Sequence, residues 1–130
     1  MFDLKNKIGG KIFSDISFNT KLYTDSGRSS FRLFIKNHKK CKYLIPNFIC
    51  SEILTLIKSE KINYQMYEIK NDGKINEYLI KNKYKKFDVI YIVNYFGSYQ
   101  KFSKKLYKYL DDKIIIEDNT FLLNFTNKRK

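Results

Sequence analysis

The stretch that decides the fold is residues 88–95, which reads DVIYIVNY. Five consecutive residues in it, Val89 to Val93, are aliphatic or aromatic, with no polar residue alternating between them. Strands of parallel sheets show this near-continuous pattern because helices cover both of their faces. The stretch therefore predicts a strand buried on both sides.

Weaker patterns of two kinds lie on either side of this stretch. Further strands are expected at residues 43–45, 62–69 and 114–116, the last of them also buried. Amphipathic helical patterns fall at residues 29–37, 75–84 and 101–110. A fourth helical pattern follows Pro46 and could be capped by Ser51 or Asn47. Helices alternating with apolar strands predict a three-layer α/β fold, a mainly parallel sheet with helices on both faces.

The length and composition indicate a single globular domain over residues 1–130. An apolar fraction of 43% argues against disorder, and no apolar run approaches the roughly 18 residues of a membrane helix. Two cysteines are too few for a disulfide framework, so we expect free thiols in the cytoplasm. Residues 124–130 are polar and basic, and we expect them to fray.

The net charge of +13 has two interpretations. It could mark a small basic α/β module that binds a polyanion such as a nucleic acid. It could also reflect composition bias, since the chain is rich in Lys, Ile and Asn and has no Ala or Trp. Only three arginines are present, and arginine dominates specific phosphate and base recognition. Composition bias is therefore the favoured interpretation, with polyanion binding as the alternative.

Three segments lie where a parallel sheet binds ligands, at the carboxyl ends of its predicted strands: Pro46-Asn47-Phe48, Asn94-Tyr95-Phe96-Gly97 and Glu117-Asp118. The turn Ser26-Gly27-Arg28-Ser29-Ser30 opens a helix, whose free N–H groups suit a phosphate. It is not a Walker A loop, because the second glycine and the Lys-Ser/Thr pair are missing; the alternative is an ordinary helix cap. Asp118 follows a strand and could pair with a protonated ring nitrogen of a cofactor, or be a solvated carboxylate. With His38 as the only histidine, neither a Ser/His/Asp triad nor a metal site is expected.

Five segments in order carry a family resemblance that spans roughly residues 8 to 123. They are Ile8-Gly9-Gly10, Ser26-Gly27-Arg28-Ser29-Ser30, Leu44-Ile45-Pro46-Asn47-Phe48-Ile49-Cys50, Val93-Asn94-Tyr95-Phe96-Gly97 and Ile115-Ile116-Glu117-Asp118. Each is weakly specific, but together and in this order they resemble the front part of DegT/StrS-type, pyridoxal-phosphate-dependent sugar aminotransferases.

The resemblance implies the N-terminal part of the large domain of a fold-type I transferase. It implies pyridoxal 5'-phosphate as the cofactor, a nucleotide-linked keto-sugar as the substrate and a role in surface polysaccharide biosynthesis. Members are typically homodimers that share the site between subunits. Carried over by position, Gly27, Arg28 and Ser29 would approach the cofactor phosphate, and Asp118 would face the pyridine nitrogen. Cys50 would lie near the position of a ring-stacking aromatic residue in many relatives.

Two departures from the family pattern bear on activity. Phe121 stands where the family has His or Gln, and it cannot hydrogen-bond a cofactor. The family's Schiff-base lysine lies further along than residue 130, and Lys128 and Lys130 are too close to Asp118 to replace it. We therefore expect an incomplete domain, a truncated or split homologue that is inactive alone. The alternatives are an enzyme completed by a second chain and the polyanion module; an unpaired sheet edge predicts self-association.

Overall fold

The computed structural model describes residues 24–122. Its elements, in chain order, are α1 Gly27–Asn37, β1 Lys42–Pro46, α2 Ser51–Ser59, β2 Asn63–Tyr67, α3 Glu77–Lys83, the 3-10 helix η2 Tyr84–Lys86, β3 Val89–Val93, α4 Lys104–Leu110 and β4 Ile114–Asp118. The Ile8-Gly9-Gly10 segment, Lys128, Lys130 and the tail at 124–130 lie outside the described residues.

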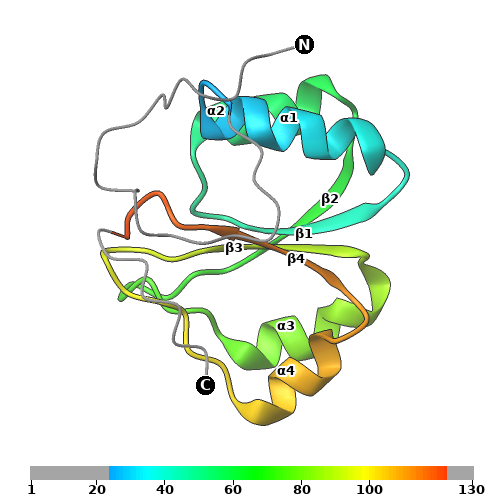
Figure 1. Cartoon of the computed structure of the whole chain (residues 1–130). Helices are drawn as coiled ribbons and strands as arrows, with labels where there is room; N and C mark the ends of the chain where they lie inside the picture. The colour runs from blue at the N-terminus through cyan, green and yellow to red at the C-terminus, as the bar shows by residue number, and fades with distance from the viewer. Residues whose placement is uncertain (1–23, 123–130) are drawn as a thin grey trace.

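The four strands form a parallel sheet in the order β2-β1-β3-β4. Helices α1 and α2 cover one face of this sheet, and α3 and α4 cover the other (Figure 1). The predicted three-layer α/β fold with a parallel sheet is therefore confirmed. The central position of β3 explains its sequence, because all five of its residues are buried.

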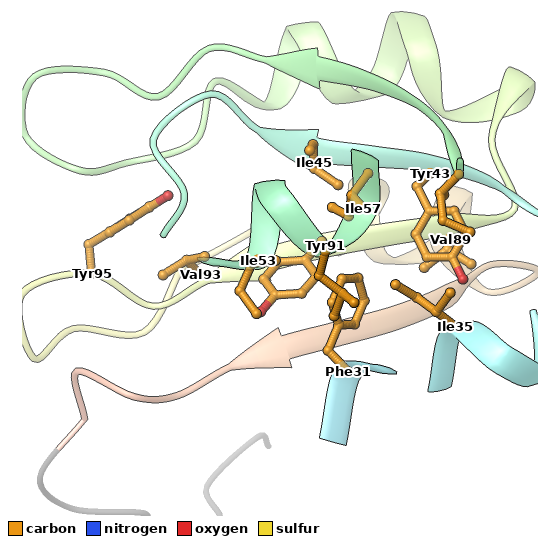
Figure 2. Packing of buried hydrophobic residues seen from close by; sticks show 12 residues of the cluster. Phe31, Ile35, Tyr43, Ile45, Ile53, Ile57, Val89, Tyr91, Val93 and Tyr95 are labelled. Carbon is orange, nitrogen blue, oxygen red and sulfur yellow. The ribbon is translucent and has the colours of Figure 1, made fainter. Parts of the chain in front are cut away.

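The alternation of side chains along β3 divides the core into two clusters. Val89, Tyr91 and Val93 pack with α1 and α2, whereas Ile90 and Ile92 pack with α3 and α4. Figure 2 shows the first cluster, in which the ring of Phe31 meets the ring of Tyr91 edge-on at a centroid distance of 5.2 Å. Each face of the sheet thus has its own hydrophobic core.

Residues 114–116 form a strand as predicted, but the prediction that this strand is buried was wrong. Strand β4 exists, but Ile114 is 37% exposed and Ile115 and Ile116 are only half-buried. The reason is its position, because β4 is an edge strand of the described sheet and pairs on one side only, with β3. A run of isoleucines does not distinguish an edge strand from a central one.

Capping residues decide where the helices begin. Ser26 caps α1, Asn76 caps α3 and Ser103 caps α4, each accepting a hydrogen bond from a backbone N–H of the first turn. Helices α3 and α4 therefore begin two and three residues later than the periodicity predicts. The cap predicted for α2 was wrong.

At α2 the N-cap residue is Cys50, which makes no side-chain cap hydrogen bond. Ser51 is already the first helical residue. Asn47 instead accepts a hydrogen bond from the backbone N–H of Ile69, at 3.0 Å, which ties the end of β1 to the segment after β2.

None of the helices in residues 24–122 has the length and apolar character needed to cross a membrane.

Buried tyrosines predict that the fold loses stability at high pH. Burial, with the nearby Cys41, raises the pKa of Tyr43 to about 12. Because this folded-state pKa lies above the unfolded value near 10, the contribution of Tyr43 is complete below pH 10 and lost as the pH rises through about 12. At about pH 11 the loss is about 1 kcal/mol of unfolding free energy.

The measurement is urea unfolding of the wild type and of Tyr43→Phe at about pH 8 and about pH 11. Tyr43→Phe should lose about 1 kcal/mol less between these pH values than the wild type. Tyr78→Phe is the control, because Tyr78 is 68% exposed. An equal loss in all three proteins would show that Tyr43 is not the titrating group.

Candidate functional site

A cavity of about 710 Å³ opens where β1, β3 and β4 end and where α1 begins. Its lining includes Gly27 and Arg28 of α1, Glu52 of α2, Tyr91 of β3 and Asp118 of β4. These residues converge because the carboxyl ends of parallel strands meet at one edge of the sheet. The cavity therefore lies at the predicted ligand-binding edge, on the side of the sheet covered by α1 and α2.

The turn that opens α1 is organised by Ser26. Its side-chain oxygen accepts a hydrogen bond from the N–H of Ser29 at 3.2 Å, and its hydroxyl donates to the hydroxyl of Ser29 at 3.1 Å. The hydroxyl of Ser29 also holds the pKa of the exposed Asp25 carboxyl below its usual value. Ser29 is thus engaged within the turn and does not line the cavity, whereas Ser30 does.

Gly27 leaves the backbone at the start of α1 open. A Cβ atom placed on it would meet no heavy atom within 4 Å. The first turn contains no acidic residue, although the carboxylate of Asp25 lies just before the cap and interacts with Ser26 and Ser29, so the positive end of the helix dipole is only partly compensated. The N–H groups of this turn can therefore be approached by an anion in the cavity.

Arg28 lies beside this open backbone and pairs with Glu52 in the first turn of α2. Both side chains line the cavity, and they are 50% and 60% exposed, respectively. An exposed pair of this kind adds little stability, so the guanidinium can exchange Glu52 for another anion at small cost. Arg28 is the only cationic residue in the described lining of the cavity.

Asp118 is held by three hydrogen bonds at the end of β4. The hydroxyl of Tyr91 donates to its Oδ2 at 2.9 Å, and the N–H and hydroxyl of Thr120 donate to its Oδ1 at 3.0 and 2.6 Å. Burial, and secondarily the negative charge of Asp118, raise the pKa of Tyr91 well above its usual value. Tyr91 therefore remains a protonated donor that orients the carboxylate at physiological pH.

A buried amide lies next to this carboxylate, in the segment Asn94-Tyr95-Phe96-Gly97 that the sequence placed at a strand end without predicting a role for Asn94. Asn94 is 1% exposed, and its Nδ2 donates to Oδ1 of Asn119 at 2.5 Å. Its Oδ1 accepts from the N–H of Gln100 at 2.7 Å, and its own N–H donates to the carbonyl of Asp118 at 3.0 Å. Asn94 therefore joins the ends of β3 and β4. The signal in the sequence was a single polar residue directly after five apolar ones.

Aromatic rings form an apolar part of the cavity. Phe48 and Phe121 line it and are 59% and 55% exposed, and both lie against the buried Tyr95 at ring-centroid distances of 5.4 and 6.4 Å. The hydroxyl of Tyr95 donates to the carbonyl of Phe48. Cys50, a free thiol, also lines the cavity. These rings offer flat apolar surface beside Asp118, but Phe121 adds no hydrogen-bonding group.

The described lining lacks two kinds of chemical group. It includes no lysine, although residues 24–122 contain many. Residues 24–122 also hold no group of three or more His, Cys, Asp or Glu side chains that could bind a metal ion. Within this part of the chain, the cavity thus combines an anion-accepting helix start, one arginine, the oriented carboxylate of Asp118, the carboxylates of Glu52 and Glu117, and apolar rings.

Three of the four residues selected from the sequence meet at this cavity. Gly27 and Arg28 contribute from α1 and Asp118 from β4, while Ser29 lies in the same turn outside the lining. The donor set fits the two ends of pyridoxal 5'-phosphate, because N–H groups and a guanidinium suit its phosphate and a carboxylate suits its pyridinium nitrogen.

We compared the sequence and the fold of the chain with those of known proteins. No protein-family model and no curated protein matches the sequence. The fold is similar to that of a pyridoxal-phosphate-bound protein of Clostridium difficile 630 assigned as an aminotransferase, with a TM-score of 0.57 and 18% identity over 74% of this chain and 28% of the other. It is also similar to histidinol-phosphate aminotransferase from Clostridium acetobutylicum, with a TM-score of 0.54 and 18% identity over 71% of this chain and 30% of the other.

The chain thus spans less than a third of the length of either neighbour. At 18% identity these likenesses show the fold alone, which is similar to part of each of these two structures. The predicted similarity to the fold of pyridoxal-phosphate-dependent aminotransferases is therefore confirmed, and the DegT/StrS branch stays a prediction.

Proposed function

We propose that residues 24–122 form one wall of a pyridoxal 5'-phosphate site in a DegT/StrS-type sugar aminotransferase that acts in the cytoplasm on a nucleotide-linked keto-sugar. One observation carries the proposal: the helix start at Gly27 and Arg28 and the carboxylate of Asp118 line the same cavity, although 90 residues separate them in sequence. The similarity of the fold to aminotransferases supports the proposal, and the ordered motifs support the DegT/StrS branch.

Each residue has a defined task in this proposal. The N–H groups at the start of α1 bind the phosphate, and Arg28 leaves Glu52 to add a charge-assisted hydrogen bond. Asp118, oriented by Tyr91 and Thr120, accepts a hydrogen bond from the protonated pyridine nitrogen. When bound, the cofactor supplies an electron sink for carbanion chemistry, and an anionic partner at its ring nitrogen strengthens that sink.

We further propose that the 130-residue chain does not transaminate by itself. The described lining contains no lysine, and Phe121 cannot replace the hydrogen-bonding His or Gln of the family. The missing lysine would come from another segment or from a complementing polypeptide. Borohydride reduction of the chain mixed with pyridoxal 5'-phosphate, followed by mass spectrometry, should label many exposed lysines weakly. Stoichiometric labelling of one lysine would contradict this part of the proposal.

Binding is tested with 4'-deoxypyridoxine 5'-phosphate, which keeps the phosphate and the pyridine ring but has no aldehyde to react with lysines. Asp118→Asn should weaken its binding by about 10- to 100-fold, because a charge-assisted hydrogen bond becomes a neutral one. Arg28→Ala should weaken it by about tenfold through the loss of a phosphate contact. Isothermal calorimetry measures both effects.

Matched controls separate these effects from general changes of charge. Asp72→Asn removes an exposed carboxylate that pairs with Lys74 and does not line the cavity, and Arg32→Ala removes an exposed arginine of α1 that does not line it. Both controls should bind like the wild type. Equal affinity in Asp118→Asn and the wild type, or no binding by the wild type, would refute the proposed site.

A further inference from the structure

Positive charge is unevenly distributed along the chain. Residues 78–110 contain eight lysines and a single carboxylate, Asp88, whereas residues 25–77 contain ten Lys or Arg and six Asp or Glu. A uniform composition bias would raise lysine everywhere and would not remove carboxylates from one stretch. In the structure, residues 78–110 include most of α3 and all of η2 and α4.

These three elements form one layer on the side of the sheet opposite α1 and α2 (Figure 1). Two contacts hold the layer together. Tyr84 of η2 packs against Tyr109 of α4 at a ring-centroid distance of 5.5 Å, and Ser103 donates its N–H and hydroxyl to the Glu77 carboxylate at 2.7 Å each. The carboxylate at the start of α3 is therefore engaged with the start of α4.

The outer surface of this layer carries unpaired lysines, which we call the basic helical face. Its members are exposed and have no carboxylate within ion-pair distance in residues 24–122: Lys85, Lys86, Lys104, Lys105 and Lys108. On the opposite side of the sheet Lys36, Lys40 and Lys58 are exposed as well, but Arg28 and Lys39 there are paired with Glu52 and Glu60. The basic helical face therefore presents a net positive surface, although the exposed Asp111 and Asp112 follow directly after α4.

Exposed tyrosines accompany these lysines. Tyr78 of α3 is 68% exposed, and Tyr107 of α4 is 38% exposed, with Lys104 and Lys108 on the same helix. Flat rings among ammonium groups suit single-stranded nucleic acid, since bases stack on rings while lysines contact phosphates. An anionic membrane would favour exposed aliphatic side chains, and α4 buries both of its leucines, Leu106 and Leu110.

We propose that the basic helical face binds single-stranded nucleic acid without sequence preference. Lysine is a point charge without the planar fork of arginine, and contacts from lysines to phosphates carry no sequence information. This surface lies on the other side of the sheet from the cavity, so the proposal is independent of the cofactor site.

The test is fluorescence anisotropy with labelled single-stranded oligonucleotides of two unrelated mixed sequences, about 20 nucleotides long. Both should bind equally, and affinity should fall by about a hundredfold between about 50 and 200 mM salt if about five phosphates are contacted. The triple variant Lys104→Gln, Lys105→Gln and Lys108→Gln keeps good helix formers in α4. It should weaken binding by tenfold or more and reduce the salt slope by about two.

The control removes the same charge from the opposite side of the sheet. Lys36→Gln, Lys40→Gln and Lys58→Gln replace three exposed lysines on and beside α1 and α2. This control should retain most of the affinity, whereas Tyr78→Ala should lose about fivefold or more through stacking. An equal loss in both triple variants would mean diffuse charge attraction. That result, undetectable binding, or binding to phosphatidylserine vesicles but not to oligonucleotides would overturn the proposal.

Discussion

Replacement of Ile90 by Ala should destabilise the protein by about 2–5 kcal/mol, a large part of the stability of an ordinary domain. Ile90 is completely buried in the central strand β3, where it packs in the cluster under α3 and α4. Truncation removes buried methyl groups and leaves a cavity that the flanking strands β1 and β4 cannot close. Urea unfolding followed by circular dichroism measures the loss.

The matched control for this prediction is Ile114→Ala, the same substitution in strand β4. Ile114 is 37% exposed at the edge of the described sheet, so its truncation should cost less than about 1 kcal/mol. Equal costs at the two positions would show that β3 is not the central strand. That result would contradict the strand order β2-β1-β3-β4.

Asn94→Leu should be the second most destabilising change, at about 2–4 kcal/mol. Leucine is close to asparagine in size, so packing is retained while the N–H of Gln100 and the Oδ1 of Asn119 lose their partner. A polar group left unpaired in the interior costs about 1–3 kcal/mol. Because the Asn94 side chain also ties the end of β3 to Asn119, directly after Asp118, this variant should weaken binding of the cofactor analogue as well.

Asn82→Leu is the control for the amide, since Asn82 is an exposed residue of α3. It should leave both stability and ligand binding nearly unchanged. Native-state hydrogen exchange gives a local reading, because the N–H of Gln100 should exchange faster in Asn94→Leu. Wild-type protection of that N–H would show that Asn94 does not hold this loop.

The sequence predicted the layers of the fold because those depend on local patterns. The run Val89 to Val93 is typical of a strand covered on both faces, and the Ser26 cap marks the start of α1. The position of β4 at the edge of the described sheet was not predictable, since strand order depends on long-range pairing and not on local hydrophobicity. For the same reason, the exposure of Ile114 differed from the expectation.

The candidate site was predictable only in part. Gly27 and Arg28 could be predicted because they lie in a turn at the start of a helix. Asp118 could be predicted because it lies at the end of a strand. The roles of Tyr91 and Asn94 depend on contacts between β3 and β4. The residue pattern of one strand does not predict which residues of another strand it contacts. Likewise, the pairing of Arg28 with Glu52 joins two helices 24 residues apart.

The most direct test of the cofactor wall is a titration of the isotope-labelled chain with 4'-deoxypyridoxine 5'-phosphate, followed by two-dimensional NMR. The N–H of Thr120 donates to Asp118, and the N–H groups of Gly27 and Arg28 begin α1, so these three amides report on both ends of the ligand. The account predicts that all three shift together, with a single dissociation constant. Unmoved amides at Gly27 and Thr120, while amides of the basic helical face shift, would contradict it.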